Sequence, residues 1–391
     1  MENLTHSLIG ATLAEIALPR NATKTQRTLF YVSGILAANL PDADLLYTSI
    51  TPAPLGYLLH HRGHTHTIAG IVILAALFGI VSLIPALRRL IRPTEPRYGT
   101  LVIAALASHL IADAWNSYGV HPFWPLTNRW YYGDAIYILE PWLWMLFGAS
   151  VAMNTRNDRG RLLVSALLIG VPVAAGFIGL IPMASLIAIA IVAAILVRSL
   201  RAKPPALRAW TSLSAALVFV LFSFGLRQGV RRIAVASTRA PERRQVVDVI
   251  LNPRAANPLC WSALLIEQAH DSLYYRNGTI AVANAAVAFR LCGSTSRAAW
   301  NDPRVQSISA LQTAMRGDCR VRAWLQFGRA PVMDAEWIVD ARFGNTGRGN
   351  FTAMQIAADT SNGACPAHLT DWSLPRADVL SARGPNSFTR S

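Results

Sequence analysis

Residues 60–87 read HHRGHTHTIAGIVILAALFGIVSLIPAL, four histidines within seven positions followed at once by a long apolar run. The run from Thr67 to Leu87 carries no charge and is about long enough to cross the ~30 Å hydrocarbon core of a bilayer. Ionisable side chains next to a membrane-spanning helix are expensive and usually functional. This stretch therefore predicts a membrane helix with a polar site at one end.

The composition of the whole chain agrees with a membrane protein. It has 391 residues, 53% of them hydrophobic and only 15% charged, with a mean hydropathy of +0.33, which is too apolar for an ordinary soluble enzyme. Five further apolar segments bring the expected membrane spans to six: 100–115, 136–153, 161–181, 182–197 and 209–226. Two shorter stretches, 5–18 and 28–40, are either short spans or re-entrant or interfacial helices. The expected number is therefore six to eight.

Basic residues indicate the orientation of these helices. With eight spans, the loops of one side carry fourteen basic residues, namely Arg20, Lys24, Arg27, Arg88, Arg89, Arg92, Arg97, Arg156, Arg159, Arg161, Arg198, Arg201, Lys203 and Arg208. The short loops of the other side carry only Arg62 and Arg129. Cytoplasmic loops are enriched in Lys and Arg, so the first side is expected to be cytoplasmic. Topology thus explains part of the net charge of +15, and we expect no nucleic-acid partner.

The same orientation brings the ionisable residues of the N-terminal region to the extracytoplasmic side. The first of them, His6, is expected to precede the first helix, and seven of the nine histidines fall within the first 121 residues. The full set comprises His6, Asp42, Asp44, the histidines of 60–66, His109, Asp113, His121, Asp134 and Glu140. Chance would scatter such residues over both sides, so their agreement predicts a single site.

Two loop motifs supply candidate metal ligands, and each also has a structural explanation. Pro41 stops a helix, after which Asp42 and Asp44 can ligate or bridge metals, or can be solvated turn residues. The histidines of 60–66 can face one ion if the chain bends at Gly63, or can form a solvated, pH-sensitive loop. Their density favours metal or phosphate chemistry.

A third motif lies on a helix. His109 and Asp113 are four residues apart and share one helical face, so they can ligate together, or Asp113 can orient the imidazole. The alternative is an ordinary hydrogen bond at a helix end. Glu140 precedes Pro141, which makes it a cap-like residue at a helix entrance. The aromatic residues between these motifs suit an interfacial belt.

Beyond residue 240 no apolar run is long enough to span a membrane, and the pattern predicts an α+β domain on the extracytoplasmic side. Strands are expected at 245–251, 261–267, 279–290, 320–327 and 336–343. A helix is expected at 302–316, capped by Asn301 or Asp302. All four cysteines lie here, where up to two disulfides can form with three possible connectivities; buried free thiols are the alternative.

The chain thus divides into four expected parts. Residues 1–153 form a membrane domain with the His/Asp site, and 154–228 add further membrane helices. Residues 229–375 form the soluble domain, and 376–391, rich in Ser, Arg and Pro, form a disordered tail.

The motifs resemble those of the YdjM-like family of inner-membrane proteins, which are regarded as metal-dependent hydrolases. The resemblance rests on His6, Pro41-Asp42-x-Asp44, His61-Arg62-Gly63-x-Thr65-His66-Thr67 and Ser108-His109-x-x-x-Asp113. His64 falls on the variable position, and Thr67 stands where the family usually has Ser. Beyond about residue 150 the resemblance is looser: Glu140 keeps a carboxylate before a proline, and Asn257–Trp261 resembles the opening of the C-terminal domain of longer members.

The resemblance implies location in the bacterial inner membrane. It also implies a distant similarity to zinc-dependent phospholipase C, an all-helical fold whose helices supply His and Asp ligands to several zinc ions. Imidazoles and carboxylates without a nearby cysteine favour zinc, with manganese or iron as alternatives. The expected ligands are His6, Asp42, His61, His66, His109 and Asp113. Asp44 is expected to bridge metals or act as general base, and Arg62 to hold phosphate in the transition state. Second-tier candidates are His64, His121, Asp134 and Glu140.

A metal with these ligands makes a water molecule acidic enough to act as a nucleophile near neutral pH. We therefore expect hydrolysis of an ester or phosphoester at the outer face of the membrane, on a substrate derived from lipid. The alternative is a non-catalytic metal-binding scaffold or a transporter. A transporter carries polar groups near the middle of the bilayer on broken helices, whereas here they lie at one face.

Overall fold

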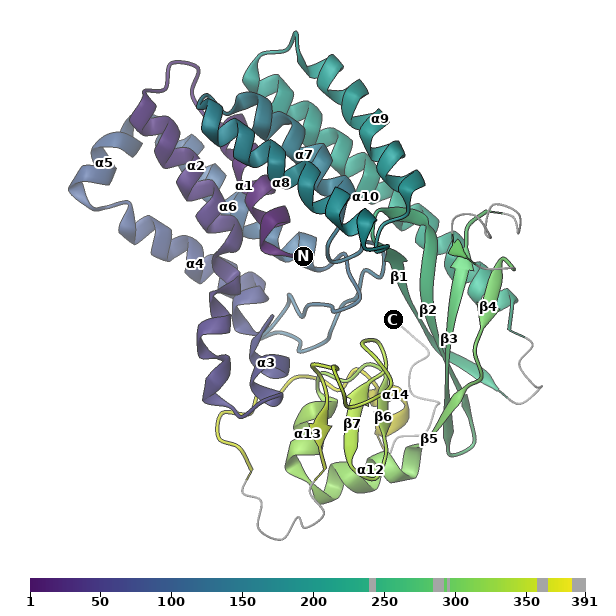
Figure 1. Ribbon diagram of the computed structural model, residues 1–391. Coiled ribbons are helices and arrows are strands. Elements are labelled where there is room, and N and C mark those ends of the chain that lie inside the picture. The colour runs from purple at the N-terminus through teal and green to yellow at the C-terminus, as the bar shows by residue number, and fades with distance from the viewer. Residues whose placement is uncertain (239–243, 284–291, 294–295, 357–364, 382–391) are drawn as a thin grey trace.

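The computed structural model describes residues 1–238, 244–283, 292–293, 296–356 and 365–381 (Figure 1). A helical bundle is followed by a C-terminal domain of two sheets and short helices. The bundle contains α1 (Asn3–Ala17), α2 (Lys24–Asn39), α4 (Ile68–Val81), α5 (Pro85–Ile91), α6 (Glu95–Asp113), α7 (Pro141–Asn154), α8 (Asp158–Phe177), α9 (Met183–Leu200) and α10 (Pro205–Ala236). Shorter helical segments lie between some of these helices, namely the 3-10 helices η1 (Leu40–Ile50), η2 (His64–His66) and η3 (Arg92–Thr94) and the α-helix α3 (Leu55–His60).

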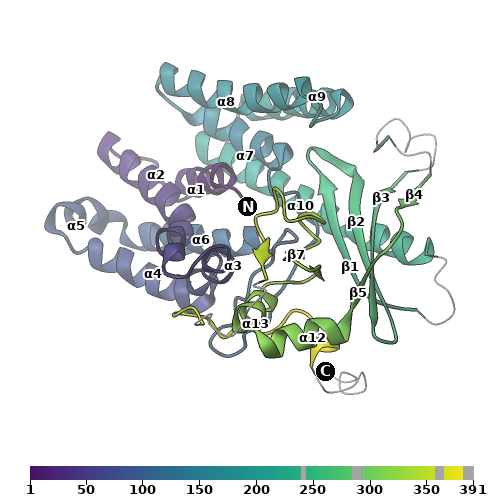
Figure 2. The ribbon, with the colours of Figure 1, turned by 60° about the horizontal axis from the view of Figure 1, so that its bottom comes forward.

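Three helices, α8, α9 and α10, are long and apolar enough to cross a membrane. A fourth candidate is the pair Leu55–His66 and Ile68–Val81, which bends by 65°. Helices α8 and α9 form an outer layer over α7 and α10 (Figure 2). In the most apolar part of α8 only 6% of residues are buried, so its leucines, isoleucines and valines face outward. Such apolar exterior is suited to contact with lipid.

Each of the eight apolar stretches contains a helix, although several boundaries differ from the expected ones. The predicted span 67–87 is interrupted, because α4 ends at Val81 and Pro85 starts a separate helix. The predicted span 136–153 begins only at Pro141, which lacks the N–H that a helix interior needs. Helix length and composition support three or four spans, and the larger count stays a prediction.

Helices α1 and α2 pack closely at two glycines. A Cβ atom on Gly10 would lie 2.4 Å from the carbonyl oxygen of Gly34, and one on Gly34 would lie 2.6 Å from that of Gly10. Only glycine therefore permits this crossing. The contact fixes the start of α1, which carries His6, beside the end of α2, which leads to Asp42.

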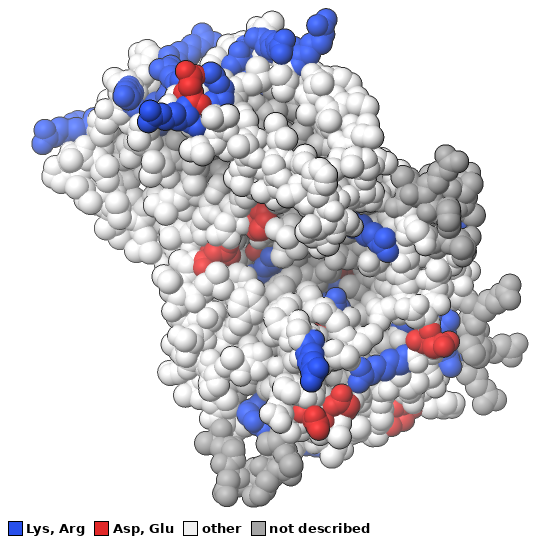
Figure 3. Space-filling view, viewed as in Figure 1, with Lys and Arg blue, Asp and Glu red and all other residues white. Residues whose placement is uncertain are grey.

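Charged side chains are distributed unevenly over the surface. Lys and Arg gather at the end of the bundle where loops join the helices, on the side away from the C-terminal domain (Figure 3). On the face shown, the flank of the bundle carries few charges, and charged residues return on the C-terminal domain. This face thus has an apolar band between two polar ends.

The C-terminal domain begins with an antiparallel five-stranded sheet in the order β1-β2-β3-β4, with β5 also paired to β3. Its strands are β1 (Gln245–Arg254), β2 (Asn257–Ala269), β3 (Ser272–Ala281), β4 (Ala298–Trp300) and β5 (Arg304–Ser307). A second sheet contains β6 (Pro331–Met333), β7 (Trp337–Asp340) and β8 (Met354–Gln355). The helices are α12 (Ile308–Gly317), α13 (Cys319–Leu325) and α14 (Ala377–Leu380).

The two faces of the larger sheet are covered differently. Val249 and Trp261 on one face pack with Val230 at the end of α10, which continues past the predicted boundary at 228. Ile266 and Trp324 belong to a core on the other face, where α12 and α13 cover the sheet. Alternation of side chains along each strand separates these two sets.

One element of the C-terminal domain was predicted with the wrong type, and another with the wrong start. The expected strand 320–327 is helix α13, because Asp318 caps it and the buried residues Val321, Trp324 and Leu325 follow helical spacing. The expected helix 302–316 starts later, since Arg304–Ser307 pair with β3 and Ser307 caps α12.

The predicted disordered tail contains a helix at its start. Helix α14 lies within 376–391 and buries Val379 and Leu380, while 382–391 lie outside the described residues. The expected strand 279–290 ends at Ala281 as part of β3, and 284–290 also lie outside the described residues.

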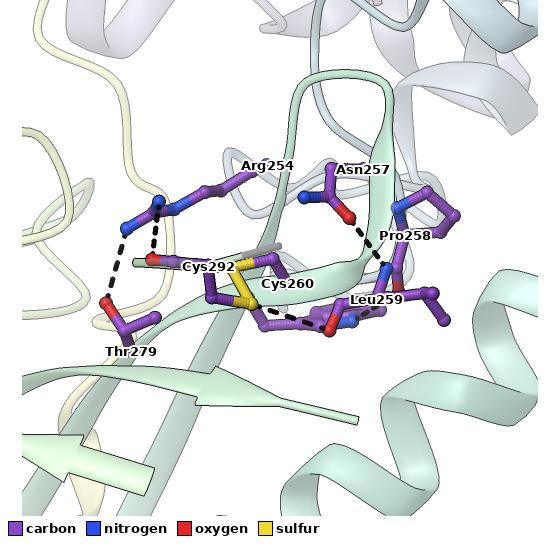
Figure 4. Close-up of a disulfide and its surroundings, with 8 residues drawn as sticks. Arg254, Asn257, Pro258, Leu259, Cys260, Thr279 and Cys292 are labelled. Carbon is purple, nitrogen blue, oxygen red and sulfur yellow. Dashed lines mark hydrogen bonds between the residues drawn. A yellow bond between two sulfur atoms is a disulfide. The ribbon is translucent and has the colours of Figure 1, made fainter. Parts of the chain in front are cut away.

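The four cysteines form two disulfides, the largest number that the sequence allowed. Cys260 bonds Cys292, and Cys319 bonds Cys365. The first ties strand β2 to the segment that follows β3 (Figure 4).

Candidate metal centre

A sharp turn places the histidines of the 60–66 segment. Arg62 adopts the left-handed conformation, with φ at 59°, which is uncommon for a residue with a side chain. A Cβ atom on Gly63 would lie 2.5 Å from the carbonyl oxygen of His60, so glycine is required there. The turn directs His61 and His66 toward the same carboxylate, that of Asp44.

Asp42, His66, His109 and Asp113 converge at the ends of η1, η2 and α6. One ligand atom from each lies within 4.8 Å of the others. The two imidazole Nε2 atoms are 3.0 Å apart, and Asp42 Oδ1 lies 3.4 Å from each of them. Asp113 Oδ2 is 3.3 Å from His66 Nε2 and 3.7 Å from His109 Nε2. We call these four residues the metal cluster.

The partners of the two histidines determine which nitrogen carries the proton. His109 Nδ1 lies 2.6 Å from the carbonyl oxygen of Ala38, which can only accept, so Nδ1 carries the hydrogen. His66 Nδ1 lies 3.0 Å from the Thr65 hydroxyl oxygen and 3.1 Å from Asp44 Oδ2; because the Thr65 hydroxyl donates its hydrogen to Asp44, both neighbours can only accept, so Nδ1 carries the hydrogen. Both Nε2 atoms therefore present lone pairs to each other and to two carboxylates. Four acceptors that converge in this manner form a site for a cation.

Asp44 lies behind the metal cluster and orients it. Its Oδ1 is 3.0 Å from His61 Nδ1, and its Oδ2 accepts from the Arg62 backbone N–H at 2.9 Å and the Thr65 hydroxyl at 2.8 Å. With His66 Nδ1 this makes four donors around one carboxylate. Asp44 was expected to bridge metals or act as a base, which stays a prediction; it contacts the ligand His66 and also stands with Asp42 and His61 in a second group of possible ligands.

The two carboxylates of η1 are ionised. Burial raises the pKa of Asp42, but its contacts with His109 and His66 outweigh this and hold that pKa well below the ordinary value. Burial likewise raises the pKa of Asp44, and hydrogen bonds with His61 and His66 more than reverse the effect. Both side chains therefore carry negative charge near the metal cluster.

Carboxylates and two basic groups meet at the metal cluster. Asp113 contacts both Arg62, whose Nε lies 3.0 Å from Asp113 Oδ2, and the buried N-terminal amine of Met1. Buried charges are stabilised by pairing or by a metal. The donor set of two imidazoles and two carboxylates fits a divalent metal.

Arg62 faces inward rather than toward a substrate. Its Nε lies 3.0 Å from Asp113 Oδ2, and its Nη1 donates to the Asp113 backbone oxygen, to Asn116 Oδ1 and to the Gly119 backbone oxygen. Its guanidinium carbon lies 4.5 Å from the centre of the Tyr118 ring. The side chain is only 2% exposed, so it holds Asp113 in place.

Two other expected ligands lie at the edge of the metal cluster. His6 lies inside α1, not before it, and its ring stacks on that of His109 with centroids 3.8 Å apart. Its Nε2 is 3.4 Å from Asp113 Oδ1, and within the described part of the chain neither of its nitrogens has a hydrogen-bond partner. His61 joins Asp42 and Asp44 in a second group whose ligand atoms also lie within 4.8 Å of one another.

The structure does not bring the second-tier candidates to the metal cluster. The His64 ring packs against Trp124, with centroids 4.6 Å apart, and the His121 ring lies 3.9 Å from that of Trp372. Asp134 pairs with Arg329, and Glu140 caps α7 by accepting from the Trp142 backbone N–H at 3.3 Å. Each of these side chains has a structural partner of its own.

Sequence reasoning missed two residues that support the site. Thr65 donates to Asp44, and Asn116 accepts from Arg62 and also from the backbone N–H of Tyr118. Thr65 lies within the quoted histidine motif, so its position was a usable signal. Asn116 follows Asp113 by three residues, but its partner Arg62 is 54 residues away, which no local pattern reveals.

A family model described as YdjM inner membrane protein matches residues 1–183. The chain is thus similar to an inner-membrane protein family over this region, which includes every residue of the metal cluster, and the predicted resemblance is confirmed there. Comparisons with curated proteins and with solved structures give no match.

Proposed function

We propose that this chain is an integral membrane hydrolase that uses a divalent metal held by Asp42, His66, His109 and Asp113. The observation that carries the proposal is the convergence of two proton-free imidazole nitrogens with two carboxylates. Zinc is our first choice because it prefers imidazole and carboxylate ligands in this combination, and manganese or iron are the alternatives.

The proposed topology has eight membrane helices, with the basic loops in the cytoplasm and the metal cluster and C-terminal domain outside. The gathering of Lys and Arg at the far end of the bundle supports it (Figure 3). Helices α1, α2, α4 and α7 have 14 to 16 residues each, which is shorter than a typical membrane span. In the proposed topology, neighbouring helices shield the ends of these short spans from lipid.

The site is suited to substrates that enter from the bilayer. Beside the two η1 carboxylates, Leu45, Leu46 and Ile50 are exposed, with Leu46 87% accessible. Exposed apolar residues at a membrane surface insert among lipid chains. An ester or phosphoester of a lipid would therefore be held next to the metal cluster.

A divalent metal, when bound, lowers the pKa of a water molecule and supplies positive charge where negative charge develops. Among the chain's own residues, His61 is placed to take a proton at Nε2. Its Nδ1 donates to Asp44, which fixes the ring and leaves the lone pair on Nε2, as in an Asp–His pair of a hydrolase; burial lowers the pKa of His61 more than Asp44 raises it, which keeps the imidazole neutral and able to accept a proton. Arg62 keeps Asp113 oriented through its buried contacts.

The test compares metal content and hydrolysis in the detergent-purified wild type and the double variant His66→Ala/His109→Ala. We expect about one equivalent of metal in the wild type, cleavage of a chromogenic ester or phosphodiester, and loss of both in the variant. His64→Ala is the matched control, because it removes a histidine of the same segment that lies outside the metal cluster. Bound metal without cleavage of either substrate would favour the scaffold, and absence of metal would overturn the site itself.

A further inference from the structure

A polar cavity of about 380 Å³ lies in the C-terminal domain, between the larger sheet and the segment around Ser117. Its volume falls within the range of roughly 300–1,000 Å³ that is typical of ligand sites. The hydrogen-bonding side chains that line it are Ser117, Asn252, Ser262, Asn277, Thr279 and Asn301. We call this site the amide cavity. It shares no residue with the metal cluster, and the inference goes beyond the proposed function.

Strand register places these side chains in rows on one face of the sheet. Asn252 lies opposite Ser262, and Ser262 lies opposite Thr279, so the three form a row across β1, β2 and β3. The adjacent row consists of Ile250, Leu264 and Asn277. Residues directly opposite in neighbouring strands point to the same face, about 5 Å apart. One row is thus entirely polar, and the adjacent row combines two apolar side chains with Asn277.

On this sheet face, the amide cavity lies between the core that α12 and α13 cover and the Cys260–Cys292 disulfide. Farther along the same face, the core around Ile266 is covered by α12 and α13. In the other direction, the next pair is Cys260 and Ala281, where the Cys260–Cys292 disulfide closes the face (Figure 4). The disulfide thereby fixes the strand ends that carry Ser262 and Thr279.

The amide cavity offers no free charge among its described lining residues. Its one charged residue, Arg342, uses its Nε on Asp340, its Nη1 on the backbone oxygens of Ser117 and Tyr118, and its Nη2 on Asp340 and the Phe327 backbone oxygen. These contacts occupy all five N–H groups of a guanidinium.

A second arginine, Arg254, lies at the rim. Its Nη1 donates to the Cys292 backbone oxygen and its Nη2 to the Thr279 hydroxyl (Figure 4). It is exposed to solvent, so an anion at the rim would gain little from it.

Most of the polar lining is available to a ligand. Within the described part of the chain, the side chains of Asn252, Ser262, Asn277 and Asn301 make no hydrogen bond to another residue, although each can donate and accept. Thr279 accepts from Arg254 and keeps its hydroxyl hydrogen for a ligand. A ligand that matches them must carry several groups that also donate and accept.

We propose that the amide cavity binds an uncharged saccharide. Sugar hydroxyls donate and accept at the same oxygen, which matches amide and hydroxyl side chains, and the C–H faces of a sugar ring suit Ile250, Leu264 and Ala299. Arg342 links the amide cavity to the metal cluster, because it holds the backbone of Ser117 and Tyr118, next to the Asn116 that holds Arg62. A saccharide here would lie against the segment that supports the metal cluster.

The test uses the full chain in a detergent without a sugar headgroup, such as an amine oxide. Maltotriose and the N-acetylglucosamine trimer are the saccharide probes, and D-glucuronate, inorganic phosphate and an uncharged blocked trialanine are the comparison probes. Binding is measured by saturation-transfer NMR and titration calorimetry. We expect one of the neutral saccharides to bind with a dissociation constant below about 1 mM and the comparison probes to bind at least about tenfold more weakly.

Two variants locate the binding. Thr279→Val keeps the side-chain shape while removing the hydroxyl, and Asn252→Leu removes an amide; each should weaken saccharide binding at least about tenfold. Asn345→Leu replaces an exposed asparagine that does not line the amide cavity, and its binding should equal that of the wild type. The proposal is overturned if neither saccharide binds, if a comparison probe binds equally well, or if Thr279→Val binds like the wild type. Metal content is unaffected by either variant, so this result is independent of the hydrolase test.

Discussion

The metal cluster and the junction between the bundle and the C-terminal domain both bury carboxylates, but these carboxylates face different partners. Asp113 of the metal cluster and Asp134 of the junction are each 1% exposed. Asp134 receives both terminal nitrogens of Arg329 at 2.9 Å, and the same guanidinium reaches Asp248 at 2.9 Å. Asp113 and Asp42 face the bare nitrogens of His66 and His109.

Burial alone therefore does not distinguish a metal ligand from a structural acid. At the junction, one guanidinium supplies fixed N–H donors to two carboxylates and completes the site. At the metal cluster, Asp113 also has basic neighbours, Arg62 and the Met1 amine, but Asp113 and Asp42 face the Nε2 atoms of His66 and His109 as well. These imidazole lone pairs are what separates the two regions, and the difference can be tested by changing each region alone.

The largest effect is expected from Arg329→Met. It leaves Asp134 buried without its partner and Asp248 with only Arg376, 3.6 Å away, and breaking a buried ion pair in this way costs about 3–5 kcal/mol. Thermal unfolding in detergent should show a markedly lower midpoint, with metal content unchanged. Asp134→Asn/Asp248→Asn/Arg329→Met, which removes all three charges, should recover part of the stability. If Arg329→Met unfolds at the same midpoint as the wild type, the ion pairs of Arg329 do not stabilise the junction.

Metal binding should stabilise the bundle and leave the junction alone. At a free zinc concentration 100 times the dissociation constant, binding to the folded state adds about 2.7 kcal/mol. A chelator should lower the unfolding midpoint of the wild type by the corresponding amount. The same shift should appear in Arg329→Met and disappear in His66→Ala/His109→Ala. A chelator effect that persists in the double variant would place the metal elsewhere.

Asp44→Asn tests whether orientation of the ligands matters. It keeps the shape but loses the charge that accepts from His61, Thr65 and His66, so metal affinity should fall about 10- to 100-fold. Competition with a coloured chelator measures this affinity. Asp334→Asn, an exposed acid far along the chain, is the control. Complete loss of metal would instead make Asp44 a ligand, as the sequence suggested.

As the pH is lowered, the metal cluster should lose its metal at a higher pH than the one at which the junction loses stability. Imidazoles must be neutral to bind a metal, and protons compete with the metal for their nitrogens, so metal content should fall as the pH is lowered. Burial raises the pKa of Asp248, but Arg329 lowers it more, to about 2 from an ordinary value of 3.8. A lowered folded pKa gives stability that is present above about pH 3.8 and is lost as the pH falls toward 2.

The acid contribution of Asp248 is the smallest effect, about 1–2 kcal/mol. Metal content and unfolding midpoints measured from pH 7 to pH 2.5 would follow the two steps. Loss of both within one step above pH 5 would contradict a separate junction.

Several features of the site could be predicted from the sequence because they depend on local spacing. The positions of His109 and Asp113 follow from one helical turn, and the bend at Gly63 follows from a glycine between histidines. Asp134 had the same local appearance as a ligand candidate. Its partner Arg329 lies 195 residues away, and no spacing rule connects the two. The strand expected at 320–327 failed for a related reason, since a short apolar run fits either a strand or the buried face of helix α13.

The sequence by itself determined an apolar, multi-helix chain with a cluster of imidazoles and carboxylates and a cysteine-containing C-terminal domain. Those properties follow from composition and from short-range periodicity. Tertiary structure alone decided which acids face imidazole lone pairs, as Asp42 and Asp113 do, and which have only arginine partners, as Asp134 does. It also brought Asn252, Ser262 and Thr279 into one row from three strands. The physical reason is that a buried polar group is defined by its partners, and in this fold those partners come from distant parts of the chain.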